Sequence, residues 1–241
     1  DMTFSKNDAP FLIVMGQSNA HAHATRLPED EIIRTPLKNV HGLSREYNQF
    51  YDLTDVTWSG FTTGGMNLGE DQDDTCCLAN VFAAKWQKAI GGADLPDLYV
   101  VQISVGGQGI AEFEVHGWNM WYSMRAPKLK PGVFGVCDIS LYPLATDILS
   151  LAVMNLIAAG KKPRIIGLHW NQWETEADTG SKALNDAEAN YKNLFWGFFT
   201  ALGSDENGTG IPLYLYRPLC ETLPADRTKK LSDLFDTFTK S

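Results

Sequence analysis

The chain has 241 residues, of which 44% are hydrophobic and 20% are charged, a globular composition that excludes an intrinsically disordered or coiled-coil protein. Its 20 Lys and Arg residues against 29 Asp and Glu residues give a net charge of −9, which argues against a nucleic-acid partner because binding to phosphates needs a positive surface. This length predicts one large domain over residues 1–241, with a core that needs no disulfide or metal.

The first half of the chain predicts two strands and one helix around a long irregular segment. Residues 11–15 form a continuous apolar run that ends at Gly16, as a buried strand does. Residues from about 29 to 70 are polar and rich in Gly and Pro, which predicts a loop-rich excursion. Apolar residues at helical spacing from Leu78 to Ile90 predict a helix that begins near Thr75, and a β-branched run predicts a strand over 98–104.

The second half alternates helices and strands. We expect helices over 140–159 and 181–202, which end at Gly160 and Gly203, strands over 164–170 and 211–216, and a last helix around 231–238. This alternation predicts an α/β fold, a three-layer αβα sandwich around a central parallel sheet. Such folds carry their sites at the carboxyl ends of the strands.

Cysteine spacing and hydropathy bear on whether the protein binds a metal, carries a redox site or crosses a membrane. The four cysteines show no C-x-x-C spacing, so neither a zinc site nor a redox motif is expected, and no cofactor is predicted. No uninterrupted apolar run approaches about 18 residues, so no membrane partner is expected. The cellular compartment stays open.

Polar segments follow the first three predicted strands: Gly16-Gln17-Ser18-Asn19, Gly106-Gly107-Gln108-Gly109 and Asn171-Gln172-Trp173-Glu174. In a parallel sheet all three gather along one edge. A serine at a strand-to-helix turn is exposed for attack, glycines let backbone N–H groups approach an oxygen, and a glutamine amide donates to a developing negative charge. The alternatives are a helix cap at Ser18, an ordinary glycine turn, and a solvated loop with Glu174 and Glu176 in water.

Together the three segments resemble the SGNH hydrolase superfamily, in its sialate O-acetylesterase-like and carbohydrate esterase branch. That branch is similar at Gly-Gln-Ser-Asn, at Gly-Gly followed by Ile110, and at Trp-x-Gln-Gly-Glu-Ser-Asp-Ala, which Trp170 to Ala177 match in part. The resemblance implies a flavodoxin-like fold, with Ser18 as nucleophile. It implies an oxyanion hole from the backbones of Ser18 and Gly107 and the side chain of Gln172, with Asn19 and Glu174 in support and no metal.

Two departures from this pattern matter. Trp173 stands where the family has Gly, which predicts an altered loop or pocket. The family's final Asp-x-x-His, the general base and its orienting carboxylate, has no match, because the histidines stand only at 21, 23, 41, 116 and 169. Three explanations stay open: a longer polypeptide or assembly that supplies the missing strand and His, a degenerate member that does not turn over, or another base among His21, His23, His116 and His169. A metal site at His21 and His23 has no carboxylate–His spacing to complete it.

Two functions follow from these observations. The first is a serine esterase that removes O-acetyl or other short acyl groups from an acylated carbohydrate, with aromatic residues facing the sugar rings; the candidates are Trp58, Phe61, Trp118, Trp121 and Trp173. For each aromatic the alternative is core packing. The second is a hydrolase-fold module that binds glycan or acts structurally in a larger assembly.

Overall fold

The computed structural model describes residues 3–17, 20, 37–43, 58–61, 78–90, 94–104, 109–110, 141–179, 181–203, 210–216 and 223–239. Within them six strands form one sheet in the order β3-β2-β4-β1-β5-β6. The strands are β1 (Asp8–Gly16), β2 (Val40–Leu43), β3 (Trp58–Gly60), β4 (Leu98–Ser104), β5 (Lys162–Asn171) and β6 (Leu213–Leu215). All neighbours are parallel except the edge pair β2 and β3.

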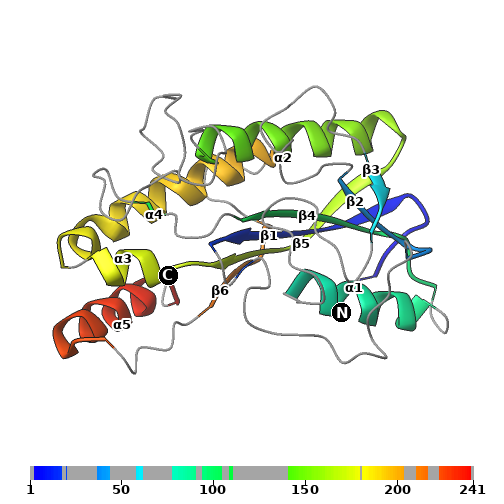
Figure 1. The fold of residues 1–241 in the computed structure, drawn as a ribbon. Coiled ribbons are helices and arrows are strands. Elements are labelled where there is room, and N and C mark those ends of the chain that lie inside the picture. Colours follow the sequence, from blue (N-terminus) through cyan, green and yellow to red (C-terminus); the bar gives the residue numbers. More distant parts are fainter. Residues whose placement is uncertain are drawn as a thin grey trace, which may run out of the picture.

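Helices cover both faces of this sheet (Figure 1). On one face lie α2 (Leu141–Ala158) and α4 (Ser181–Ala201), and on the other lies α1 (Leu78–Ile90). Two further helices, α3 (Glu174–Thr179) and α5 (Ala225–Thr239), pack beside α4. The predicted α/β architecture with a mostly parallel, helix-flanked sheet is therefore confirmed.

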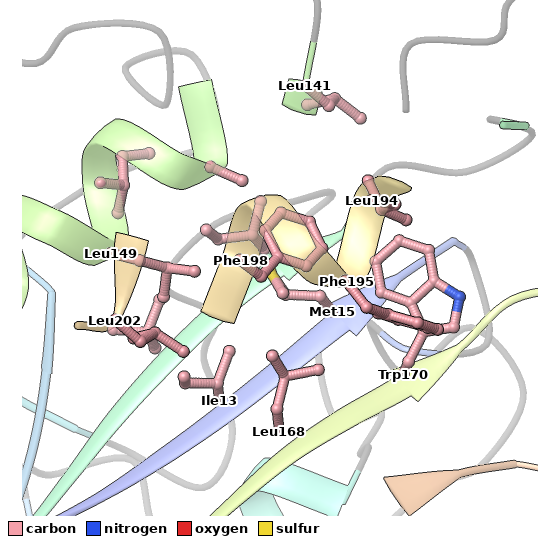
Figure 2. Packing of buried hydrophobic residues seen from close by; sticks show 14 of the residues in the cluster. Ile13, Met15, Leu141, Leu149, Leu168, Trp170, Leu194, Phe195, Phe198 and Leu202 are labelled. Carbon is pink, nitrogen blue, oxygen red and sulfur yellow. The ribbon is translucent and has the colours of Figure 1, made fainter. Parts of the chain in front are cut away.

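The central strand β1 shows why the sheet needs a layer on each side. All nine of its residues are buried. Its side chains alternate, so that Phe11, Ile13 and Met15 join the core beneath α2 and α4, while Leu12 and Val14 join the core beneath α1. Figure 2 shows Ile13, Met15, Leu168 and Trp170 meeting side chains of the two overlying helices. A continuous apolar strand of this kind is stable only between two layers.

The strand order differs from the one that the resemblance implies. Counted along the chain, the five parallel strands lie in the order 2-3-1-4-5, whereas flavodoxin has the order 2-1-3-4-5. The flavodoxin-like order is therefore not confirmed. The four predicted strands are present, and β2 adds a fifth parallel strand within the segment for which we predicted no regular structure.

Helix α2 passes the length and composition test for a membrane-spanning helix, contrary to the expectation from apolar runs. Seven of its residues, from Leu141 to Leu156, are nevertheless buried against the sheet and α4. Its outer side exposes Met154 and Ile157, at 61% and 58% of their surface. The packing of α2 is that of a core helix with an apolar outer stripe.

Candidate functional site

The ends of β4, β1 and β5 lie side by side, with β1 in the middle. Gly16 at the end of β1 pairs with Ser104 at the end of β4 and with Asn171 at the end of β5. The segments that follow these strands therefore start from one edge of the sheet, as expected. Of the predicted site residues, Ser18, Asn19 and Gly107 lie outside the described residues, and their roles stay predictions.

The turn after β1 lies in close contact with β5. Gly16 has a φ of 138°, and a Cβ atom placed there would lie 1.9 Å from the carbonyl oxygen of Asn171. The next residue, Gln17, donates its backbone N–H to that same oxygen at 3.1 Å. Only glycine fits at position 16, because a side chain would have to displace the backbone of β5.

The side chain of Gln17 joins the first polar segment to the third. It is buried, and its Oε1 accepts hydrogen bonds from the Thr175 hydroxyl at 2.8 Å and from the Thr175 backbone N–H at 3.3 Å. These two bonds fix the first turn of α3 against the end of β1. The motif contained Gln17, but nothing in the sequence indicated its partner, which is 158 positions away.

The carboxylate of Glu176 joins the second polar segment to the third. It accepts hydrogen bonds from the backbone N–H of Ile110 at 2.8 Å, from Nε2 of Gln172 at 3.4 Å and from the hydroxyl of Tyr191 at 3.3 Å. Glu176 is only 1% exposed, and burial raises the pKa of its carboxyl to about 7 against the opposing effect of these hydrogen bonds. The solvated alternative for Glu176 is therefore wrong.

Gln172 and Glu174 occupy different environments. The Gln172 side chain is fully buried directly after β5 and lies against Glu176. Glu174 is the first residue of α3 and is half-buried. An acidic residue in the first turn suits the positive end of a helix. The structure thus places the predicted Gln172 donor in a network with Glu176, a residue to which the motif alone assigned no role.

Trp173 keeps a backbone conformation that glycine adopts easily. Its φ is 117°, and it stands where the resembled family has Gly. The indole is fully buried against Tyr191 at a centroid distance of 4.5 Å and against Phe235 and Phe238 of α5 at 6.3 and 6.5 Å. Its N–H has no hydrogen-bond partner among the described residues, so apolar packing holds it. The backbone therefore has a positive φ here, at a cost in strain, and the altered pocket stays a prediction.

Of the two described histidines, His41 lies far from this edge of the sheet, whereas His169 stands on β5 two residues before Asn171. His41 bonds Asp97 at 2.8 Å and pairs with Tyr99 near the start of β4, five residues from Ser104, which is about 16 Å along a strand. His169 stacks on Tyr214 at 4.6 Å, and burial lowers its pKa to about 4. Neither arrangement suits a base at the ends of β1 and β5.

Three of the five aromatics considered for sugar contact pack inside the protein. Phe61 and Trp173 are buried, and Trp58 packs edge-on against Phe11 and Tyr99 at 5.7 and 5.0 Å. For these three, core packing is the better interpretation; Trp118 and Trp121 lie outside the described residues. Within the described part of the chain, no group of three His, Cys, Asp or Glu side chains is placed to hold a metal ion.

Solved structures with a similar fold exist at low sequence identity. The crystal structure of NanS aligns with a TM-score of 0.60 and 16% identity, over 98% of this chain and 76% of that one. A protein from Arabidopsis thaliana aligns with a TM-score of 0.50 and 12% identity, over 96% of this chain and 98% of that one. No protein-family model and no curated protein sequence matches the chain. The comparisons show a shared α/β fold.

Proposed function

We propose that the protein is a serine esterase that removes O-acetyl or other short acyl groups from a carbohydrate. The observation that carries the proposal is the convergence of β4, β1 and β5 at Gly16, where Gln17 and Glu176 bind the three polar segments together. The similarity of the overall fold to NanS agrees with this assignment. The carbohydrate part rests on the resemblance of the three motifs.

In the proposed reaction the Ser18 hydroxyl attacks the acyl carbon and gives up its proton to a base. The tetrahedral oxyanion accepts hydrogen bonds from the backbones of Ser18 and Gly107 and from the Gln172 amide. Collapse breaks the bond to the sugar oxygen, which takes the proton from the base and leaves as a hydroxyl. Water then attacks the acyl-enzyme by the same steps, which releases the carboxylic acid and regenerates Ser18. Donors of this kind typically contribute about 3–4 kcal/mol each to lowering the barrier.

The general base is the element that this proposal leaves to experiment. His41 and His169 are engaged elsewhere, which leaves His21, His23 and His116 as the histidines of this sequence to test. Substitution of each by Ala, with the rate of p-nitrophenyl acetate hydrolysis measured against pH, identifies the base as the one variant that loses the acid limb of the profile.

The direct test of the proposal compares the protein with its Ser18→Ala variant on p-nitrophenyl acetate and on an O-acetylated sugar. We expect the variant to lose hydrolysis and the formation of an acyl-enzyme detectable by mass spectrometry. A folded Ser18→Ala variant with an undiminished rate overturns the proposal, because the reaction then uses another nucleophile.

A second candidate function is a module that binds glycan without turnover. Two observations favour it: the sequence lacks Asp-x-x-His, and neither described histidine suits a base, since His41 is bonded to Asp97 and burial lowers the pKa of His169 to about 4. Saturable glycan binding by the protein, together with hydrolysis no faster than that of Ser18→Ala, distinguishes this function from the esterase.

A further inference from the structure

We propose that Glu176 is a positioning residue that holds the Gln172 amide and the backbone at Ile110 in one fixed arrangement. The inference rests on the esterase function proposed above, in which Gln172 donates to the oxyanion. Glu176 touches no substrate in this proposal. It acts through the groups that donate to it, one from the segment after β4, one from the segment after β5, and the hydroxyl of Tyr191 on α4.

Burying the Glu176 carboxylate costs more free energy than burying an apolar side chain that only fills the same space. A buried carboxylate loses its hydration, and an apolar side chain of the same size would avoid that loss. Here three donors offset part of that loss, and two of them come from segments of the candidate site. Unlike an apolar residue, a carboxylate at this point can accept the Ile110 N–H, and it thereby connects two segments that lie 66 positions apart in the sequence.

The carboxylate also sets the orientation of the Gln172 amide. An ionised carboxylate only accepts hydrogen bonds, so the amide turns its NH₂ group toward Glu176 rather than its oxygen. An oxyanion hole needs the same polarity, because the reacting oxygen is stabilised by N–H donors and repelled by a carbonyl. A protonated carboxyl, or an amide in its place, accepts either orientation of Gln172.

The charge on Glu176 therefore affects catalysis. Among the described residues, Tyr191 on α4, whose pKa burial raises well above 10, and Glu174 on α3, which acts on the same tyrosine, are near it. Arg227 on α5 donates to the carbonyl oxygen of the neighbouring Ala177 at 3.0 Å. The donors of Ile110, Gln172 and Tyr191 offset only part of the cost of burying the charge. We expect kcat to rise as Glu176 ionises.

The test uses Glu176→Gln, Glu176→Asp and the surface control Glu188→Gln on α4, whose carboxylate pairs only with Lys192 among the described residues. We expect Glu176→Gln to lower kcat on p-nitrophenyl acetate about 100-fold with KM within about twofold, because the donor is misplaced while the binding surface is kept. Glu176→Asp keeps the charge, matches the residue of the resembled family, and is expected to retain more activity than Glu176→Gln. Glu188→Gln is expected to behave as the unchanged protein.

Hydrogen exchange at the Ile110 amide gives a readout independent of activity. In Glu176→Leu, which removes the acceptor oxygen, its protection factor is expected to fall at least about tenfold at pH 8, whereas that of Ile13 in β1 stays unchanged. If that protection falls but kcat is unchanged, the positioning role is wrong and the esterase stands. If the unchanged protein is inactive while the protection still falls, the esterase is wrong and only the structural contact remains. Retained protection at Ile110 overturns the contact itself.

Discussion

The Glu176 carboxylate accepts the backbone N–H of Ile110 at 2.8 Å, and this bond joins the segment after β4 to the helix that follows β5. The bond between Gln17 and Thr175 joins the segment after β1 to the same helix. Helix α3 is only six residues long, yet it holds the segments that follow all three converging strands. The candidate site is therefore organised around α3 rather than around the strands alone.

The contact between Gln17 and Thr175 is expected to contribute measurably to stability. Thr175→Val keeps the shape of the side chain and removes the hydroxyl that donates to Gln17 at 2.8 Å. We expect a loss of about 1–2 kcal/mol in the free energy of unfolding, measured by urea denaturation. The matched control is Thr200→Val on the exposed side of α4, where the loss is expected to stay below about 0.5 kcal/mol. If both variants lose the same free energy of unfolding, the hydrogen bond between Thr175 and Gln17 does not stabilise the fold.

Trp173 allows strain and packing to be separated. Trp173→Ala and Trp173→Gly leave the same cavity beside Tyr191 and Phe235, and each is expected to cost at least about 3 kcal/mol. Alanine keeps the penalty of a φ of 117°, whereas glycine does not. We therefore expect the glycine variant to be the more stable of the two by about 1 kcal/mol, the reverse of the usual order. If the alanine variant is as stable as the glycine variant in thermal and urea unfolding, the backbone at position 173 is not strained.

Gly16 tests how tightly the end of β1 lies against β5. Gly16→Ala places a methyl group on the Asn171 carbonyl oxygen and is expected to cost at least about 3 kcal/mol. Gly203 also has a positive φ but has open space around it, so Gly203→Ala is expected to cost only about 1 kcal/mol. The difference between the two variants combines the steric contact with the larger backbone strain of a φ of 138° against 77°. Similar values for both contradict the close contact with β5.

The parts of the fold that were predictable depend on local signals. The bounds of β4 agree with the predicted strand because its apolar, β-branched residues end sharply at Ser104. Helices α2 and α4 end just before Gly160 and Gly203, which adopt φ values of 74° and 77° as helix-terminating glycines do. These features need no knowledge of distant residues.

The parts that were missed depend on contacts between distant segments. Strands β2 and β3 have four and three residues, too few for a periodic pattern, and they exist because β2 pairs with β4. The burial of Glu176 has no local signal either, because a carboxylate in a polar stretch indicates solvent until its donor at Ile110 is known. Sequence therefore indicated which segments carry the candidate site, while the structure shows what holds them together.

The raised pKa of Glu176 makes stability depend on pH in a direction opposite to that of a salt-bridged carboxylate. Its folded pKa is about 7 against an ordinary 4.5, so between these values the folded protein holds a proton that the unfolded chain releases. The contribution of the Glu176 carboxyl to the free energy of unfolding is complete below pH 4.5 and decreases by about 3 kcal/mol as the pH rises to about 7. Urea denaturation at intervals from pH 4 to 8 measures it. Subtracting the curve of Glu176→Gln removes the contributions of the other groups, and a difference that does not change with pH contradicts the shift.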